Sequence, residues 1–225
     1  MTPEATNENA ARRCHDDLIV QLIERGARVL DLGCGAGELL QRLKREKQVH
    51  ARGVEIESDN IIRCIERGLA VIQGDLDEGL AEFSNLTYDW VILSQTLQVV
   101  HKPALVLREM LRVGRRAIVS FPNFGYWRVR VQLALGGRMP RTGAIPYTWH
   151  ESPNIHHLTI ADFRSFCEEA KAQVLQEIPI AHGRPRQGWP WANLLAEEVL
   201  FVLTAGTPPS DASAAAQTWQ SPDKT

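Results

Sequence analysis

The sequence lacks the long apolar run that a membrane-spanning protein needs. No stretch of about 18 apolar residues occurs in its 225 residues, which argues against a transmembrane helix. The first ten residues, MTPEATNENA, are polar and do not contain the apolar core of a secretory signal. We therefore expect a cytoplasmic protein.

A surplus of charge of one sign is also missing. Twenty-five Lys and Arg residues against 27 Asp and Glu residues give a formal net charge of −2, so no overall field attracts a nucleic acid or an anionic membrane. The four cysteines, at positions 14, 34, 64 and 167, are far apart and form no C-x-x-C pair. This spacing favours neither a disulfide framework nor a zinc site.

The composition that is present, with 44% hydrophobic and 23% charged residues, is ordinary for a globular protein. Short apolar runs alternate with amphipathic stretches, which is typical of βα units around a parallel sheet. The runs predict five strands, at 28–33, 50–55, 70–73, 90–94 and 116–121. A later pair of runs, 173–180 and 199–204, favours a hairpin at the sheet edge. The prediction is an α/β fold with a doubly wound, mostly parallel seven-stranded sheet and an antiparallel edge hairpin.

This rhythm divides the chain into three parts. Residues 1–25 are predicted to be a polar segment followed by a helix, and residues 26–205 to be one domain. Residues 206–225 are rich in Ala, Ser, Thr and Pro, and they are predicted to be a disordered tail because they offer little apolar surface to bury.

Residues 124–157 interrupt the rhythm and are predicted to be an insertion over the sheet. They combine five aromatic residues and four arginines with a single acid, Glu151. Apolar residues alternate from Trp127 to Leu135 as in a strand, yet an insertion at this place is often helical, so its type stays open. A helix is predicted from Thr159 to Ala170, because Thr159 and Asp162 have the spacing of a capping box.

The strongest local signal is the run D-L-G-C-G-A-G-E from Asp31 to Glu38, between the first predicted strand and the next helix. Gly33, Gly35 and Gly37 let the backbone turn sharply and approach a ligand, and a helix N-terminus directs free N–H groups toward it. The dinucleotide fingerprint G-x-G-x-x-G would need a glycine at position 38, and the G-x-x-x-x-G-K-[ST] order of a phosphate-binding loop is absent. A nucleotide-like ligand without a pyrophosphate is therefore favoured.

Acidic residues stand at the ends of three successive predicted strands. A carboxylate at Asp31 suits a ligand with an ammonium or sulfonium group, and Glu55 can accept hydrogen bonds from both ribose hydroxyls. Asp75 can accept one from an adenine amino group, although a solvated turn explains it equally well, and Ile56 offers an apolar face to the base. Because ligands of such sheets bind outside the carboxyl ends of the strands, the set indicates S-adenosylmethionine or its product S-adenosylhomocysteine.

The runs V-L-D-L-G-C-G-A-G-E, G-V-E-I-E and Q-G-D-L-D resemble the class I S-adenosylmethionine-dependent methyltransferases. More narrowly, residues 26–180 resemble the MetW family of methionine biosynthesis proteins through L-S-Q-T-L-Q, S-F-P-N-F-G and T-W-H-E-S-P-N-I-H-H. The resemblance implies a Rossmann-like methyltransferase fold that is the partner of a homoserine O-acyltransferase of the MetX type. It implies a place for Ser94 near the methionine part of the ligand, and cofactor contacts for Asp31, Gly33, Gly35, Gly37, Glu55 and Asp75.

The sequence assigns no catalytic residue and no metal site. Methyl transfer to an amine or a hydroxyl usually needs a general base. The candidates His101, His150, His156 and His157 are explained as well by loop or capping roles, and the last three lack the i, i+4 spacing of a metal site. The run S-F-P-N ending at Asn123 has one proline where the N/D-P-P-Y/F motif of amino-group methyltransferases has two, which weakens the case for nitrogen methylation.

Three functions remain open. The leading hypothesis is an accessory protein of methionine biosynthesis that binds S-adenosylmethionine or S-adenosylhomocysteine and docks on the homoserine acyltransferase. The alternative is a methyltransferase that acts on a small molecule, with the insertion as a lid over the substrate. An RNA methyltransferase would use the arginines and aromatic residues of the insertion, but the balanced net charge argues against it. The same residue types equally suit a surface that docks on a protein.

Overall fold

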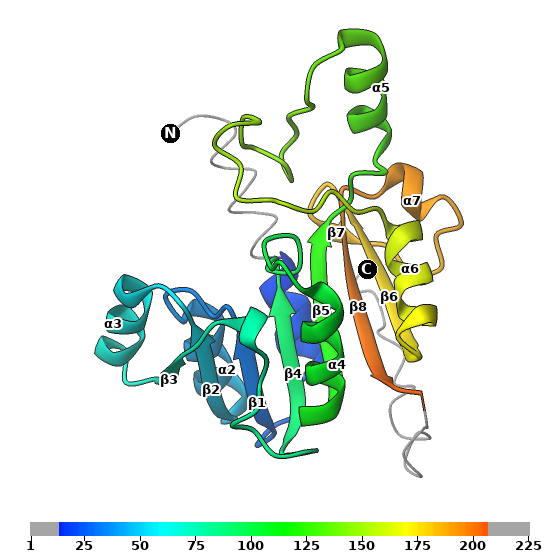
Figure 1. Cartoon of the computed structure of the whole chain (residues 1–225). Coiled ribbons are helices and arrows are strands. Elements are labelled where there is room, and N and C mark those ends of the chain that lie inside the picture. The colour runs from blue at the N-terminus through cyan, green and yellow to red at the C-terminus, as the bar shows by residue number, and fades with distance from the viewer. Residues whose placement is uncertain (1–13, 207–225) are drawn as a thin grey trace, which may run out of the picture.

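Eight strands form one sheet in the order β3-β2-β1-β4-β5-β8-β6-β7 (Figure 1). The structure is a computed structural model that describes residues 14–206. The five strands predicted from the first half of the sequence are present and pair in parallel, which confirms the doubly wound α/β fold. They are β1 (Arg28–Leu32), β2 (His50–Glu55), β3 (Ala70–Gln73), β4 (Tyr88–Ser94) and β5 (Gly114–Pro122).

The predicted antiparallel edge is also present. Strand β8 (Glu198–Ala205) pairs antiparallel with β5, and β6 (Ala172–Ala181) pairs antiparallel with β8. The sheet has eight strands rather than seven because β7 (Arg184–Pro185) adds two residues beside the end of β6. A strand of two residues has no alternation of apolar and polar side chains, so the sequence pattern could not reveal it.

Helices cover both faces of the sheet, and successive residues of each strand face opposite layers. In β4, Val91 and Leu93 pack in the core that α4 (Pro103–Val113) and α6 (Ile160–Glu169) cover. Trp90 and Ile92 pack in the core that residues 14–22 and α2 (Glu38–Lys47) cover. Three further elements lie at the periphery: α3 (Ser58–Glu66), the 3-10 helix η1 (Leu76–Glu78) and α7 (Ala192–Leu195).

The insertion forms a helix, which settles the question that its sequence left open. Helix α5 (Trp127–Gly136) projects away from the sheet, and a long loop leads back from it to α6 (Figure 1). The capping box predicted for α6 is present, because Thr159 Oγ1 accepts from Asp162 N and the Asp162 carboxylate accepts from Thr159 N.

Parts of the three-part division fall beyond what the structure describes. Residues 14–22 are helical, and residues 1–13 of the predicted first part lie outside the described residues. The predicted tail also lies outside them, except for Gly206. No helix among residues 14–206 is long and apolar enough to cross a membrane.

Candidate functional site

The eight site residues predicted from the sequence lie at one edge of the sheet, where the parallel strands end. Strand β1 contains Asp31 and leads into the glycine loop, β2 ends at Glu55, and β4 ends at Ser94. Asp75 follows β3 and starts η1. The fold therefore places at one edge residues that are up to 63 positions apart in the sequence.

The glycine loop has two glycines that packing requires, Gly33 and Gly37, and one that faces open space, Gly35; a Cβ on Gly33 would lie 2.8 Å from Thr96 Cγ2. A Cβ on Gly37, the residue before α2, would lie 2.5 Å from Leu69 Cδ1 and 2.9 Å from Cys64 Sγ. A Cβ on Gly35 would meet no atom within 4 Å, although its φ of +55° still strains any other residue. Gly37 therefore packs the loop against the protein, and Gly35 leaves room for a ligand above the loop.

Glu55 holds the glycine loop in place. Its Oε2 accepts a hydrogen bond of 2.7 Å from Gly35 N, and its Oε1 accepts bonds of 2.9 and 3.0 Å from Ile56 N and Glu57 N. The side chain is buried. A carboxylate has about four acceptor sites, so these three bonds leave about one site for a ribose hydroxyl. Both ribose hydroxyls can bind together only if one bond to the backbone opens.

Asp75 and Ile56 follow β3 and β2, at the same edge of the sheet. Asp75 Oδ1 accepts a hydrogen bond of 2.8 Å from Asp77 N and so caps η1, and its half-buried carboxylate retains acceptor capacity. The Ile56 side chain is 54% exposed. An isoleucine side chain that is half exposed at a strand end offers an apolar surface on which a flat base can pack.

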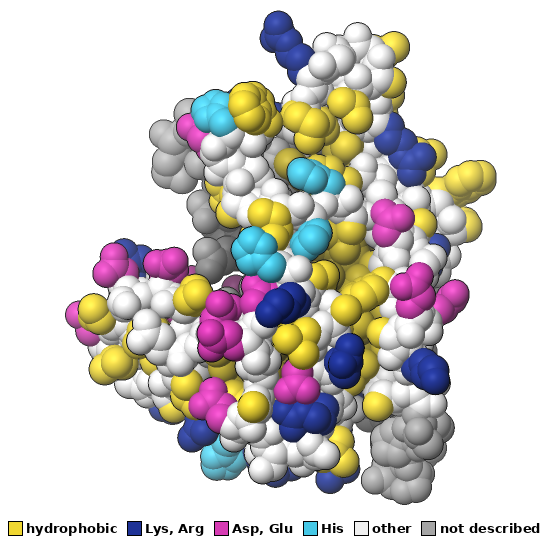
Figure 2. Space-filling model, in the orientation of Figure 1, with side chains coloured by type: hydrophobic (Ala, Val, Ile, Leu, Met, Phe, Trp, Pro, Cys, Tyr) yellow, Lys and Arg dark blue, Asp and Glu magenta, His cyan; other side chains and the backbone are white. Residues whose placement is uncertain are grey.

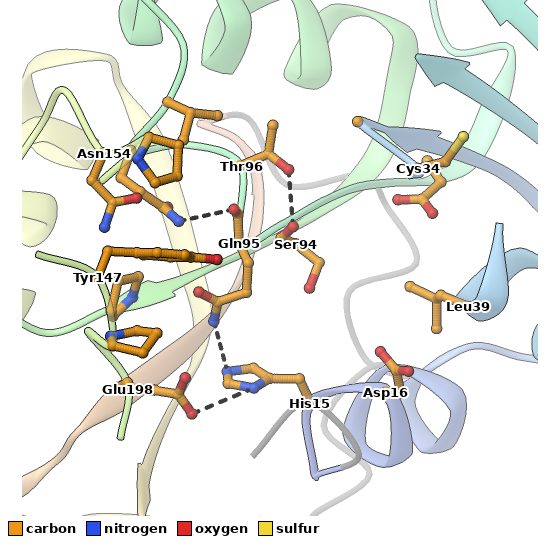
Figure 3. A pocket seen from close by; sticks show the side chains of 18 of the residues that line it. His15, Asp16, Cys34, Leu39, Ser94, Gln95, Thr96, Tyr147, Asn154 and Glu198 are labelled. Carbon is orange, nitrogen blue, oxygen red and sulfur yellow. Dashed lines mark hydrogen bonds and ion pairs between the residues drawn. The ribbon is translucent and has the colours of Figure 1, made fainter. Parts of the chain in front are cut away.

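A cavity of about 340 Å³ lies next to the loop, and three of the predicted residues, Asp31, Gly33 and Ser94, line it. Figure 3 shows Cys34 and Leu39 on one side of it and Tyr147 and Asn154, from the insertion, on the other. Gly35, Gly37, Glu55, Ile56 and Asp75 are not part of its lining. The predicted site therefore has an enclosed half beside β1 and β4 and an open half at the ends of β2 and β3.

Asp31 makes the enclosed half receptive to a cation. Its side chain is 3% exposed, and burial raises its pKa to about 8, with smaller contributions from the negative charges of Asp16 and Glu55. A positive group in the cavity would stabilise the carboxylate and reverse this shift. The arrangement thus suits a ligand with an ammonium or sulfonium group.

The cavity contains a second polar group, formed by His15, Gln95 and Glu198, which was not expected from the sequence. His15 Nδ1 lies 3.6 Å from Glu198 Oε2, and Gln95 Nε2 lies 3.3 Å from His15 Nε2 (Figure 3). Both His15 and Glu198 are buried, and burial raises the pKa of Glu198 although the charge of His15 opposes the shift. Gln95 has a left-handed backbone with φ of +54°, a strain that often marks functional sites.

The position of Glu198, an acid next to a predicted strand, could have indicated from the sequence that it belongs to the site. Glu198 heads the apolar run E-V-L-F-V-L, much as Asp31, Glu55 and Asp75 stand at or near the ends of the first three strands. Because β8 runs antiparallel to β5, its amino end lies at the edge where the parallel strands have their carboxyl ends. His15 belongs to no motif, and only the packing of the first helix brings it to the cavity.

The other residues considered for catalysis lie elsewhere. None of His101, His150, His156 and His157 lines this cavity, and no group of His, Cys, Asp and Glu among residues 14–206 could hold a metal ion. Asn123 is fully buried, its Nδ2 donates to Asn193 O and Ala196 O, and its Oδ1 accepts from Gly125 N and Ile160 N. All its hydrogen-bonding capacity toward the backbone is in use, so it holds the fold rather than a target nitrogen.

Comparison with known sequences gives a family match. The family model described as methionine biosynthesis protein MetW matches residues 13–203. The bifunctional methionine biosynthesis protein MetXA/MetW of Rhodopirellula baltica is 38% identical over 172 residues, which are 72% of this chain and 28% of that protein. The ubiquinone biosynthesis O-methyltransferase of Paracidovorax citrulli is 28% identical over 159 residues, which are 68% of this chain and 66% of that protein. The chain thus spans less than two thirds of either relative.

Solved structures share the fold. The magnesium protoporphyrin IX methyltransferase of Synechocystis PCC 6803, solved with bound S-adenosylhomocysteine, has a TM-score of 0.64 at 16% identity, over 91% of this chain and 88% of that one. The [4+2]-cyclase SpnF has a TM-score of 0.61 at 14% identity, over 85% of this chain and 80% of that one. Such low identities show the class I methyltransferase fold alone. The presence of a cyclase among these structures means that the fold does not assign a reaction.

Proposed function

The chain belongs to the MetW family of methionine biosynthesis proteins, and from that membership we propose that it binds S-adenosylmethionine or S-adenosylhomocysteine and supports a homoserine O-acyltransferase of the MetX type. The observation that carries the proposal is the R. baltica relative, whose name joins MetXA and MetW and of which this chain matches 28%. Two parts fused in one polypeptide meet at high effective concentration. We propose that the separate chains bind each other to the same effect, and that they do so in the cytoplasm.

The residues at the strand ends fit the proposed ligand. Asp31 would face its cationic groups in the enclosed half of the site, with Gly33 and Ser94 beside the methionine part. Glu55 would take a ribose hydroxyl, while Asp75 and Ile56 would take the adenine. The space above Gly35, which a Cβ would enter without touching the protein, supports this placement. When bound, S-adenosylmethionine supplies a methyl group activated by its sulfonium, and S-adenosylhomocysteine supplies none.

The group of His15, Gln95 and Glu198 favours a second candidate, a methyltransferase that acts on a small molecule. If His15 carries its proton on Nδ1, facing Glu198, its Nε2 can accept a proton from an amine or a hydroxyl once Gln95 has moved aside. A small acceptor could occupy the part of the cavity between this group and Tyr147. The remaining task of the protein would be to place that acceptor in line with the methyl group.

One experiment tests the leading proposal. The purified protein is mixed with the MetX-type acyltransferase of the same organism, with and without S-adenosylhomocysteine, and association is measured together with homoserine acylation. We expect a complex at micromolar concentration and a higher rate of acylation than the acyltransferase shows alone. Absence of association at these concentrations would exclude the proposal.

The second candidate needs a different measurement. Transfer of a labelled methyl group is followed across a panel of small metabolites, with the wild-type protein and with His15→Gln. If the protein is a methyltransferase, the variant should lose turnover and keep the cofactor. A tightly bound cofactor without any turnover in the wild type would count against this candidate and leave the leading proposal intact.

A further inference from the structure

The projecting part of the insertion exposes an unusual amount of apolar surface. We call residues 127–149 the insertion arm. Every residue of α5 except Val129 is exposed. Eight of the fourteen exposed large hydrophobic side chains in the described part of the chain belong to the arm or follow it closely, with Leu135 85% and Trp149 77% exposed. Figure 2 shows this apolar surface around the projecting helix. Monomeric proteins rarely leave such a patch uncovered.

The composition of the arm is that of an interface core. Aromatic residues, Met and Arg are enriched in such cores, and all of them occur here. Trp127, Met139, Tyr147 and Trp149 are exposed, and Arg128, Arg130, Arg138 and Arg141 add positive charge. A partner surface that matches the arm would be apolar at its centre and acidic at its rim.

Within the arm, helix α5 is joined to the loop that returns to the sheet. Gln132, on α5, donates through Nε2 to Arg141 O and accepts through Oε1 from Arg141 N, at 3.1 and 3.0 Å. Beyond Arg141, the backbone forms a tight turn with bonds between Thr142 and Ile145. Ile145 packs with Tyr126 and Val129 in a small core at the base of the arm. These contacts join the helix and the loop into one packed unit.

The same loop forms one wall of the ligand cavity. Its contributions are Gly143, Ala144, Pro146 and Tyr147, followed by Pro153 and Asn154. Ile155 N and His156 N then donate to Gln98 O, which fixes the loop to the segment after β4. A ligand in the cavity thus contacts the unit that carries the exposed apolar surface.

We propose that the insertion arm is the surface on which the acyltransferase docks, and that its loop makes the affinities for ligand and acyltransferase depend on each other. The inference rests on the proposed function, because the occupant of the arm is the MetX-type partner. A coupling of this kind is reciprocal: the factor by which the ligand changes the affinity for the partner equals the factor by which the partner changes the affinity for the ligand.

The docking surface is tested with Leu135→Glu and Trp149→Ala, and with Ile65→Glu on α3 as the matched control. All three side chains are highly exposed, so the variants should fold. We expect the arm variants to weaken association with the acyltransferase at least about tenfold, as a charge or a cavity at an interface core does. Their affinity for S-adenosylhomocysteine should stay within about twofold in the absence of partner. Ile65→Glu should bind both as the wild type does.

The outcomes separate the two proposals. If the wild type does not associate, the proposed function is wrong. If the wild type associates and both arm variants do so equally well, the function stands and the docking surface is elsewhere. Salt-sensitive binding of a uridine oligonucleotide that requires the arm, with undisturbed association of the acyltransferase, would also overturn the docking surface.

The coupling is tested by calorimetry with the wild type and Gln132→Ala, which removes both bonds to Arg141. In the wild type, saturating S-adenosylhomocysteine should change the dissociation constant of the acyltransferase by at least about fivefold. The acyltransferase should change that of S-adenosylhomocysteine by the same factor. Gln132→Ala should still bind S-adenosylhomocysteine and the acyltransferase, but each should change the dissociation constant of the other by a smaller factor than in the wild type. Equal affinities with and without ligand in the wild type would overturn the coupling.

Discussion

The buried carboxyl group of Asp31 lowers the stability of the ligand-free protein near neutral pH, and a bound cationic ligand would offset this loss. Its pKa in the folded protein is about 8, whereas a carboxyl group in an unfolded chain ionises near pH 4. Between these pH values the folded state keeps a proton that the unfolded state has released, so this group makes stability fall as the pH rises from about 4 to 8.

We therefore expect Asp31→Asn to raise the free energy of unfolding of the ligand-free protein at pH 7 by on the order of 2 kcal/mol, because the amide never ionises. Urea denaturation measures the change. The gain should shrink as the pH falls from 7 toward 5, because ionisation of the wild-type carboxyl then favours the unfolded chain by less free energy as the pH approaches its unfolded pKa of about 4. A variant that is no more stable than the wild type at pH 7 would show that burial costs Asp31 little.

The same carboxyl should give ligand binding a pH dependence. If Asp31 ionises when S-adenosylmethionine binds, one proton is released, and affinity gains up to about tenfold per pH unit below pH 8. The amino group of the ligand also titrates, so the useful quantity is the ratio of wild-type to Asp31→Asn affinity. Calorimetry should show this ratio rising from pH 6 to pH 8. A constant ratio would mean that Asp31 does not face the cation.

Gly35 and Gly68 form a matched pair for testing the loop. Both have left-handed backbones, with φ of +55° and +68°, and a Cβ on either would meet no atom within 4 Å. Changing each to Ala should cost about 1 kcal/mol of stability through backbone strain. Only Gly35→Ala should weaken the binding of S-adenosylhomocysteine, at least about tenfold, because only its Cβ enters the space assigned to the ligand. Equal affinities of the two variants would move the ligand away from the loop.

At this scale the sequence predicted residues whose position follows from the order of strands. Asp31, Glu55 and Asp75 were placed at one edge by the rule that parallel strands end together, and Ser94 was placed near the ligand by the family resemblance; all four lie at that edge. His15 could not be placed, because it reaches the cavity through the packing of a helix that has no fixed relation to the sheet pattern.

Asn123 joins three elements, since its side chain bonds to the starts of the insertion and of α6 and to the backbone around α7. Asn123→Ala would leave two carbonyl groups and two N–H groups buried without partners. We expect it to lower the free energy of unfolding by about 3 kcal/mol. Asn154→Ala, at a half-buried position, serves as the control and should cost less than about 1 kcal/mol. If urea denaturation gives similar losses of the free energy of unfolding for the two variants, Asn123 does not hold the three elements together.

Helix α5 shows why hydrophobic periodicity does not predict every element of secondary structure. The periodicity of apolar residues reports which face of a segment is buried, and it predicted β4 and α6 because each packs on a core. Helix α5 buries only Val129, so its apolar side chains follow no core. The alternation from Trp127 to Leu135 therefore does not report a buried face, and the segment is a helix despite its strand-like pattern.

The whole molecule closes the cavity with segments from both ends of the described chain. His15 comes from the first helix, Glu198 from the last strand, and Tyr147 from the insertion, while the glycine loop comes from β1. The sequence predicted the parallel half of the fold, in which each strand neighbours the next along the chain or nearly so. It also predicted an insertion over the sheet, and that insertion lines the cavity. It did not predict the contributions of His15 and Glu198, because contacts between distant segments depend on side-chain packing that no single run encodes.

Binding should stabilise the whole domain at once, since both cores share one sheet. S-adenosylhomocysteine at 100 times its dissociation constant contributes about 2.7 kcal/mol, which for a domain of this size raises Tm by about 5 to 10 °C in a single transition. Without ligand, Asp31→Asn should have a higher Tm than the wild type. The rise in Tm that the ligand causes should be smaller in the variant, so the substitution changes these two quantities in opposite directions. A general increase in stability would raise both melting temperatures and leave the ligand shift unchanged. Such an unchanged shift, measured by calorimetric scanning, would exclude Asp31 from the ligand site.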